Sequence, residues 1–186
     1  MIFGRKKTRK RVGLFGGSFN PPHKGHSEIV KWLFMKGLVD EVLAIPCFVH
    51  PFGKELAPFD DRITMCRLAF AKLGLPVSVS DVERQLGGES RTLRTIEHLT
   101  EENPEKRFFL VTGGDLEKET DKWHCFDKIK ALVDFIRIPR GPESPIPDIS
   151  STVVREAIAK GGIGWREHVE TEVAVYIVTK ALYRKP

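Results

Sequence analysis

The chain has 186 residues, of which 41% are hydrophobic and 30% are charged, and its mean hydropathy is −0.22. This length and composition predict one domain of ordinary size with an apolar core. No apolar run approaches the roughly 18 residues that a membrane span requires, so we expect no membrane association through a helix.

The net charge of +5 arises at one end of the chain. Positions 1–11 hold six basic and no acidic residues, and the remainder holds 24 basic against 25 acidic residues. We therefore expect a basic N-terminal extension at 1–11 and a single domain at 12–186. Such an extension could contact RNA or acidic lipid, but a solvated tail is the simpler interpretation, and nucleic acid is not an expected partner.

The three cysteines, Cys47, Cys66 and Cys125, are far apart and show no metal-binding spacing. Free thiols in a reducing cytoplasm are the simplest interpretation, and we expect no metal site built from protein ligands. The sequence gives no indication of the oligomeric state.

Apolar runs bounded by glycine, proline or polar residues predict strands, and runs with helical spacing predict helices. In chain order the prediction is a strand at 12–15, a helix at 24–36, strand 41–48, helix 60–73, strand 77–82, helix 92–102, strand 107–112, helix 126–132, strand 134–138, helix 150–160 and helix 167–182. This alternation favours a Rossmann-like α/β fold, a doubly wound parallel sheet of about five strands with helices on both faces.

The chemically distinctive segment follows the first strand and reads GGSFNPPHKGH. Gly16 and Gly17 let the backbone approach an anion closely, and Ser18 adds a hydroxyl. His23 and His26 bracket the start of a helix, where free N–H groups and the helix dipole favour bound phosphate. Either histidine alone could be a surface residue, but the combination predicts a phosphate site.

This segment resembles the pattern of the HxGH nucleotidyltransferase superfamily. In detail it is similar to nicotinate/nicotinamide mononucleotide adenylyltransferases, whose usual form is GG-S/T-F-D/N-P-x-H-x-G-H. A second segment, Ile149–Arg155 with the sequence ISSTVVR, resembles the ISSTxxR motif of the same family. Because ATP carries about four negative charges, a second helix start with hydroxyls and a guanidinium suits its outer phosphates. Either Ser150 or Ser151 could also be an ordinary N-cap.

Other segments resemble the family less closely. Residues 90–96 resemble S-Y-T-x-x-T-L, with Thr92 in place but Arg91 instead of tyrosine. Gly113, Asp115 and Trp123 resemble a G-x-D…W segment whose tryptophan stacks on the pyridine ring, although a rim tryptophan and a capping aspartate are the simpler alternatives. The family's Pro-Pro-His-Lys loop is not matched in this sequence, and His50 or Lys54 could take its role from a shifted position.

The resemblance implies the following roles for residues of this chain. Catalytic roles fall to His23, His26 and Arg155. ATP binding falls to Gly16, Gly17, Ser18, Phe19, His23, His26, Gly113, Asp115, Arg140, Ser150, Thr152 and Arg155. Binding of the pyridine nucleotide falls to Asn20, His50, Lys54, Thr92 and Trp123.

The implied reaction joins nicotinate or nicotinamide mononucleotide to the AMP part of ATP, with Mg²⁺ held mainly by the ATP phosphates. Two alternatives remain at this stage. The chain could be another HxGH enzyme, such as a phosphopantetheine adenylyltransferase or a cytidylyltransferase, or a nucleic-acid-binding module that uses the basic tail. Arg91 adds positive charge and favours nicotinate only weakly over nicotinamide.

Overall fold

Five strands form one parallel sheet in a computed structural model that describes residues 9–113, 123, 125–139, 141 and 144–184. The strand order is β3-β2-β1-β4-β5. The strands are β1 (Lys10–Gly17), β2 (Glu41–Pro46), β3 (Val77–Val79), β4 (Lys106–Gly113) and β5 (Asp134–Ile138). The order reverses between β1 and β4, which confirms the predicted doubly wound sheet. Ligands bind such sheets beyond the carboxyl ends of the strands at this reversal.

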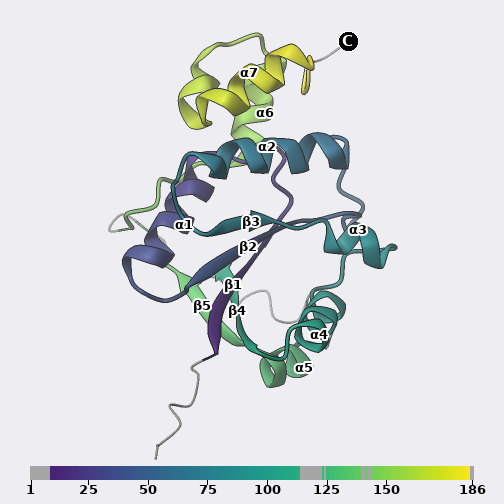
Figure 1. Cartoon of the computed structure of the whole chain (residues 1–186). Coiled ribbons are helices and arrows are strands. Elements are labelled where there is room, and N and C mark those ends of the chain that lie inside the picture. The colour runs from purple at the N-terminus through teal and green to yellow at the C-terminus, as the bar shows by residue number, and fades with distance from the viewer. Residues whose placement is uncertain (1–8, 114–122, 124, 140, 142–143, 185–186) are drawn as a thin grey trace, which may run out of the picture.

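Helices cover both faces of the sheet (Figure 1). They are α1 (Lys24–Met35), α2 (Phe59–Ala71), α3 (Val82–Leu86), α4 (Thr92–Glu102), α5 (Phe126–Leu132), α6 (Ser151–Ala159), the 3₁₀ helix η3 (Gly164–His168) and α7 (Thr171–Thr179). None of these helices is long and apolar enough to cross a membrane.

Two apolar clusters form the core, one on each face of the sheet. Val12 and Leu14 of β1 pack with α3, α4 and α5, whereas Phe15 packs with α1, α2, α6 and α7. Side chains alternate along a strand, so the short apolar run of β1 serves both clusters. A Cβ on Gly13 would lie 3.1 Å from Val39, so a glycine lets the chain after α1 pack tightly on β1.

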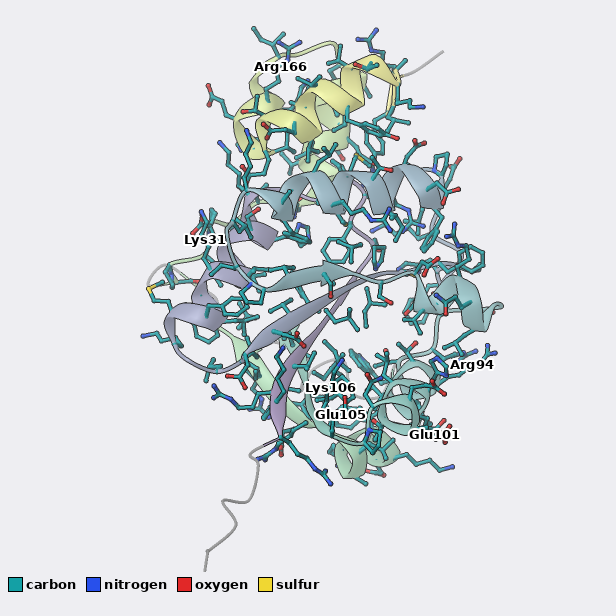
Figure 2. The ribbon with its side chains drawn as sticks, in the orientation of Figure 1. Lys31, Arg94, Glu101, Glu105, Lys106 and Arg166 are labelled. Carbon is teal, nitrogen blue, oxygen red and sulfur yellow. The ribbon has the colours of Figure 1, made fainter. Side chains whose placement is uncertain are left out.

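The last helices form a separate layer that lies beyond α2 in Figure 1, at the far side of the molecule from α4 and α5. The hydroxyl of Tyr176 on α7 donates to Asp61 on α2 at 2.8 Å. Figure 2 places Arg166 of η3 on this layer and Lys106, at the start of β4, near the opposite end. The C-terminal layer therefore extends the face that carries α1 and α2.

Several predicted boundaries need correction. β1 begins at Lys10, so Lys10 and Arg11 belong to the sheet and not to a basic extension. Arg11 is held there by Asp40 at 2.7 Å and by the carbonyl of Gly37 at 2.6 Å. Val82 begins α3 instead of ending a strand. The predicted helix at 167–182 is two helices, η3 and α7, because buried Val169 is extended and interrupts them.

Candidate active site

The turn between β1 and α1 begins with a strained residue. Phe19 has a φ of +44°, in the left-handed region that non-glycine residues rarely adopt. Phe19 is 1% exposed, and its ring packs edge-on against Phe15, with the ring centroids 5.4 Å apart. Phe19 is therefore part of the core, and its contact with ATP remains a prediction that this burial does not support.

His23 and His26 lie together at the start of α1. Their ring centroids are 3.7 Å apart, and Nδ1 of His26 accepts a hydrogen bond of 3.0 Å from the backbone N–H of His23. A neutral imidazole that accepts at Nδ1 carries its proton on Nε2. Nε2 of His26 is thus the nitrogen that can donate to a ligand. The ring of Phe19 lies 4.9 Å from that of His26 and supports it.

Both histidines are neutral at neutral pH in the free protein. Burial, followed by the nearby charge of His168, lowers the pKa of His23 to about 4. Burial, followed by the charge of His23, holds the pKa of His26 well below its ordinary value. Nδ1 of His23 is buried without a hydrogen-bond partner in the described part of the chain. The pair therefore presents uncharged ring nitrogens in the free protein. A bound phosphate would supply the negative charge that is absent beside them.

Gly25 separates the two histidines, and packing explains why a glycine stands there. A Cβ at this position would lie 3.0 Å from Nδ1 of His23 and 3.3 Å from the carbonyl oxygen of Pro147. A side chain here would require the ring of His23 or the backbone at Pro147 to move by a few tenths of an ångström. Close contact thus favours a glycine at this position of the HxGH motif.

The second motif meets the first in space. The hydroxyl of Ser150 accepts from the N–H of Val153 at 3.3 Å and caps α6, as predicted. Arg155 donates to the carbonyl of Asn20 at 2.7 Å, across a separation of 135 residues. Ser151 donates to the carbonyl of Pro21 at 2.8 Å. The start of α6 is therefore fixed against the turn that carries the histidines.

Arg62 of α2 is a central residue of this region that the sequence did not reveal. It is 1% exposed, and its guanidinium donates to the carbonyls of Ser18 at 3.0 Å, Cys47 at 2.7 Å and Ala57 at 2.9 Å. Burial lowers the pKa of this guanidinium, but an arginine remains charged at neutral pH. One buried cation thus joins the segments that follow β1 and β2, beneath the predicted phosphate site.

The predicted acceptor residues lie around the neighbouring loop. His50 is half-buried and Lys54 is exposed in the loop between β2 and α2, and Thr92 is the first residue of α4. Trp123 packs partly against the cluster under α4 and α5, with its ring 6.3 Å from that of Phe126. A ligand contact for each of these four residues remains a prediction.

Asn20 has a structural role that was not predicted. Its side chain is 2% exposed, and its Oδ1 accepts from the N–H of Ala57 at 3.1 Å. Because this amide oxygen already has a hydrogen-bond partner, it gives no support for the predicted contact of Asn20 with a pyridine nucleotide. Asp115 and Arg140, both predicted to bind ATP, lie outside the described residues. Gly113 ends β4 opposite Ile138, at the edge of the sheet where the site lies.

Comparisons with known proteins agree with this geometry. The sequence model of the family described as Cytidylyltransferase-like matches residues 14–157, a span that includes both motifs. A protein of Anaeromyxobacter dehalogenans, described as "Probable nicotinate-nucleotide adenylyltransferase", is 41% identical over 184 residues, covering 94% of this chain and 97% of that protein. A protein of Halalkalibacterium halodurans with the same description is 32% identical over 192 residues, covering 94% and 92%.

A solved structure adds support at the level of the fold. The nicotinic acid mononucleotide adenylyltransferase of Plasmodium falciparum, complexed with NaAD, has a TM-score of 0.79 and 18% identity, covering 94% of this chain and 97% of that one. At this identity the likeness concerns the fold alone. With both motifs joined at one sheet edge and close relatives along nearly the whole chain, this protein belongs to the nicotinate-nucleotide adenylyltransferase family of cytidylyltransferase-like nucleotidyltransferases.

Proposed function

We propose that the protein transfers the AMP part of ATP to nicotinate mononucleotide, or to nicotinamide mononucleotide, and releases pyrophosphate in NAD biosynthesis. One observation carries the proposal: Arg155 and Ser151 bond the turn that presents His23 and His26. The two helix starts to which we assign phosphate thus lie against each other. The names of the similar proteins support a pyridine nucleotide as acceptor and favour the nicotinate form.

In this reaction a phosphate oxygen of the mononucleotide forms a bond to the α-phosphorus of ATP. The bond from that phosphorus to the bridging oxygen breaks, and its electron pair leaves with pyrophosphate. The attacking phosphate is already an anion, so catalysis consists mainly of positioning and of stabilising charge. We assign donation to the reacting phosphate to His23 and His26, and the leaving pyrophosphate to Arg155.

Mg²⁺ fits this site as an ion that ATP brings with it. Among the described residues, no three His, Cys, Asp or Glu side chains come together. The site instead offers imidazole, hydroxyl and guanidinium groups, which suit phosphate oxygens. We therefore assign Mg²⁺ to the phosphates and water, where it would neutralise charge on the departing pyrophosphate.

The test is a pyrophosphate-release assay with ATP and, in separate reactions, nicotinate mononucleotide, nicotinamide mononucleotide and phosphopantetheine. CTP replaces ATP in a further reaction, which addresses a cytidylyltransferase. We expect the highest kcat/KM with nicotinate mononucleotide and ATP. Failure of both pyridine nucleotides would overturn the proposed acceptor.

Removing part of the basic tail tests whether the protein is a nucleic-acid-binding module instead of an enzyme. The deletion should cover residues 5–8, because β1 begins at Lys10 and a longer deletion would damage the sheet. We expect turnover to persist after this deletion. We also assign the enzyme to the cytoplasm, since its three cysteines, Cys47, Cys66 and Cys125, are free thiols.

A further inference from the structure

A hydrogen-bonded cluster connects α3 to the loop that follows β2. The carboxylate of Glu83 accepts from the N–H of Phe48 at 2.9 Å and from the hydroxyl of Ser90. The same hydroxyl oxygen accepts from the N–H groups of Phe48 at 2.9 Å and Val49 at 3.3 Å. The backbone N–H of Ser90 donates to the carbonyl of Val49 at 3.0 Å. We call Glu83 and Ser90, with these bonds, the Glu83–Ser90 latch.

A second set of bonds fixes the helix that carries Glu83. Arg94 of α4 donates to the carbonyls of Leu86 at 2.5 Å and Gly87 at 2.6 Å, at the end of α3. Figure 2 shows Arg94 on the side of α4 that lies toward α3. A helix of five residues forms few bonds of its own, so these contacts, together with the ion pair of Arg84 with Asp60 on α2 at 2.5 Å, place Glu83.

The latch lies between two positions assigned to the acceptor substrate. His50 follows Val49 directly, and Thr92 lies two residues after Ser90. The latch therefore fixes the start of the β2–α2 loop against the start of α4. The other described bonds of this loop join it to α2 and to the turn after β1: Arg62 donates to Cys47 and Ala57, and Asn20 accepts from Ala57.

We propose that Glu83 and Ser90 are positioning residues for the mononucleotide acceptor, because the latch holds His50 and Thr92 at a fixed separation. This inference rests on the proposed function. In the contacts described, the side chains of Glu83 and Ser90 bond this loop and each other, and neither bonds the turn with His23 and His26. Loss of the latch should thus weaken acceptor binding and leave ATP binding intact.

The test compares Ser90→Ala and Glu83→Gln with the wild type, measuring the KM of nicotinate mononucleotide and of ATP separately. We expect the KM of the mononucleotide to rise about five- to tenfold in Ser90→Ala, and less in Glu83→Gln, which keeps an acceptor oxygen. The KM of ATP should change by less than about twofold. Ser90→Thr retains the hydroxyl and should restore most of the acceptor binding.

Ser80→Ala is the matched control, because its hydroxyl accepts from the N–H of Val82 at 3.2 Å, at the other end of α3. It should leave both KM values near those of the wild type. Amide hydrogen exchange tests the latch without any substrate: residues 48–53 should exchange about tenfold faster in Ser90→Ala.

The outcomes separate the two proposals. If the wild type uses the mononucleotide, two results would overturn the positioning role of Glu83 and Ser90. They are equal rises in both KM values and unchanged amide hydrogen exchange in residues 48–53. A wild type that releases no pyrophosphate with either pyridine nucleotide overturns the proposed function and the inference together.

Discussion

The two halves of the site are built in different ways. The turn at 16–26, which forms the ATP half together with the start of α6, is buried in the core: Asn20 and His23 are 2% and 8% exposed. The acceptor half, formed by the β2–α2 loop, α3 and the start of α4, carries exposed side chains: Val49 and Phe52 are 44% and 71% exposed. Substitutions at the buried positions of the turn should therefore affect folding and turnover together, and those in the acceptor half should affect the binding of one substrate.

Arg62 should show the largest effect, because it stabilises both halves. Arg62→Ala removes a buried cation and leaves three carbonyls without this donor, and we expect the free energy of unfolding to fall by about 3–5 kcal/mol. Urea denaturation followed by circular dichroism measures the change. Arg67→Ala is the control, since Arg67 is an exposed arginine on the same helix. A loss below about 1 kcal/mol for Arg62→Ala would show that the bonds to the three carbonyls contribute little.

His26 tests the ATP half in catalysis. His26→Ala removes both the acceptor for the N–H of His23 and the Nε2 donor. We expect the rate of pyrophosphate release to fall by roughly a hundredfold or more, as for other charge-stabilising donors. His98→Ala, on α4, should retain turnover. If folded His26→Ala turned over like the wild type, the catalytic assignment of His26 would be wrong.

Acid should weaken the ATP half before the rest of the protein. The pKa of His23, lowered to about 4 by burial, lies below the ordinary value of 6.5. Between these values the unfolded chain binds a proton that the folded chain does not, so stability is complete above pH 6.5 and is lost as the pH falls towards 4. We expect His23 to contribute a loss of about 2 kcal/mol between neutral pH and pH 4.5.

The measurement is urea denaturation across this pH range for the wild type and for His23→Gln, which cannot titrate. The difference between the two curves reports His23 together with its effect on the pKa of the neighbouring His26. Glu83, whose pKa is raised by burial, acts in the opposite direction and is common to both proteins. Identical pH dependence in the two proteins would contradict the account.

Lys54 should show the smallest effect, because it is exposed in the acceptor half. Lys54→Ala should raise the KM of nicotinate mononucleotide about two- to threefold at low salt, and less as salt screens the charge. The KM of ATP should not change. Lys31→Ala is the control: Lys31 is paired with Glu28 on α1 (Figure 2). A similar rise in Lys31→Ala would indicate a general effect of net charge.

The sequence predicted the fold well because the fold depends on local patterns. Helix 92–102, helix 126–132 and strand 134–138 have the predicted bounds, since apolar spacing and flanking turn residues mark their ends. A cap at Ser150 or Ser151 was also predicted from their place before a helix, and the structure has it at Ser150. These features can be inferred from a few neighbouring residues.

The acceptor half was harder to predict because its contacts are distant and involve backbone groups. α3 was missed since the alternation of residues 77–82 continues into it, and five residues show no helical period. Glu83 and Arg62 bind backbone groups up to 44 residues away, and a backbone partner leaves no trace in residue types. Arginine usually lies on an exposed face, so the residue type of Arg62 did not indicate that it is buried.

The bond between Arg155 and Asn20 has a consequence for synthesis on the ribosome. Translation proceeds from the N-terminus, so the turn with the two histidines leaves the exit tunnel long before α6 is made. Until then a nascent chain lacks the guanidinium and hydroxyls that complete the ATP half. The two motifs can therefore come together only after α6 has been made and the C-terminal layer can pack on α2.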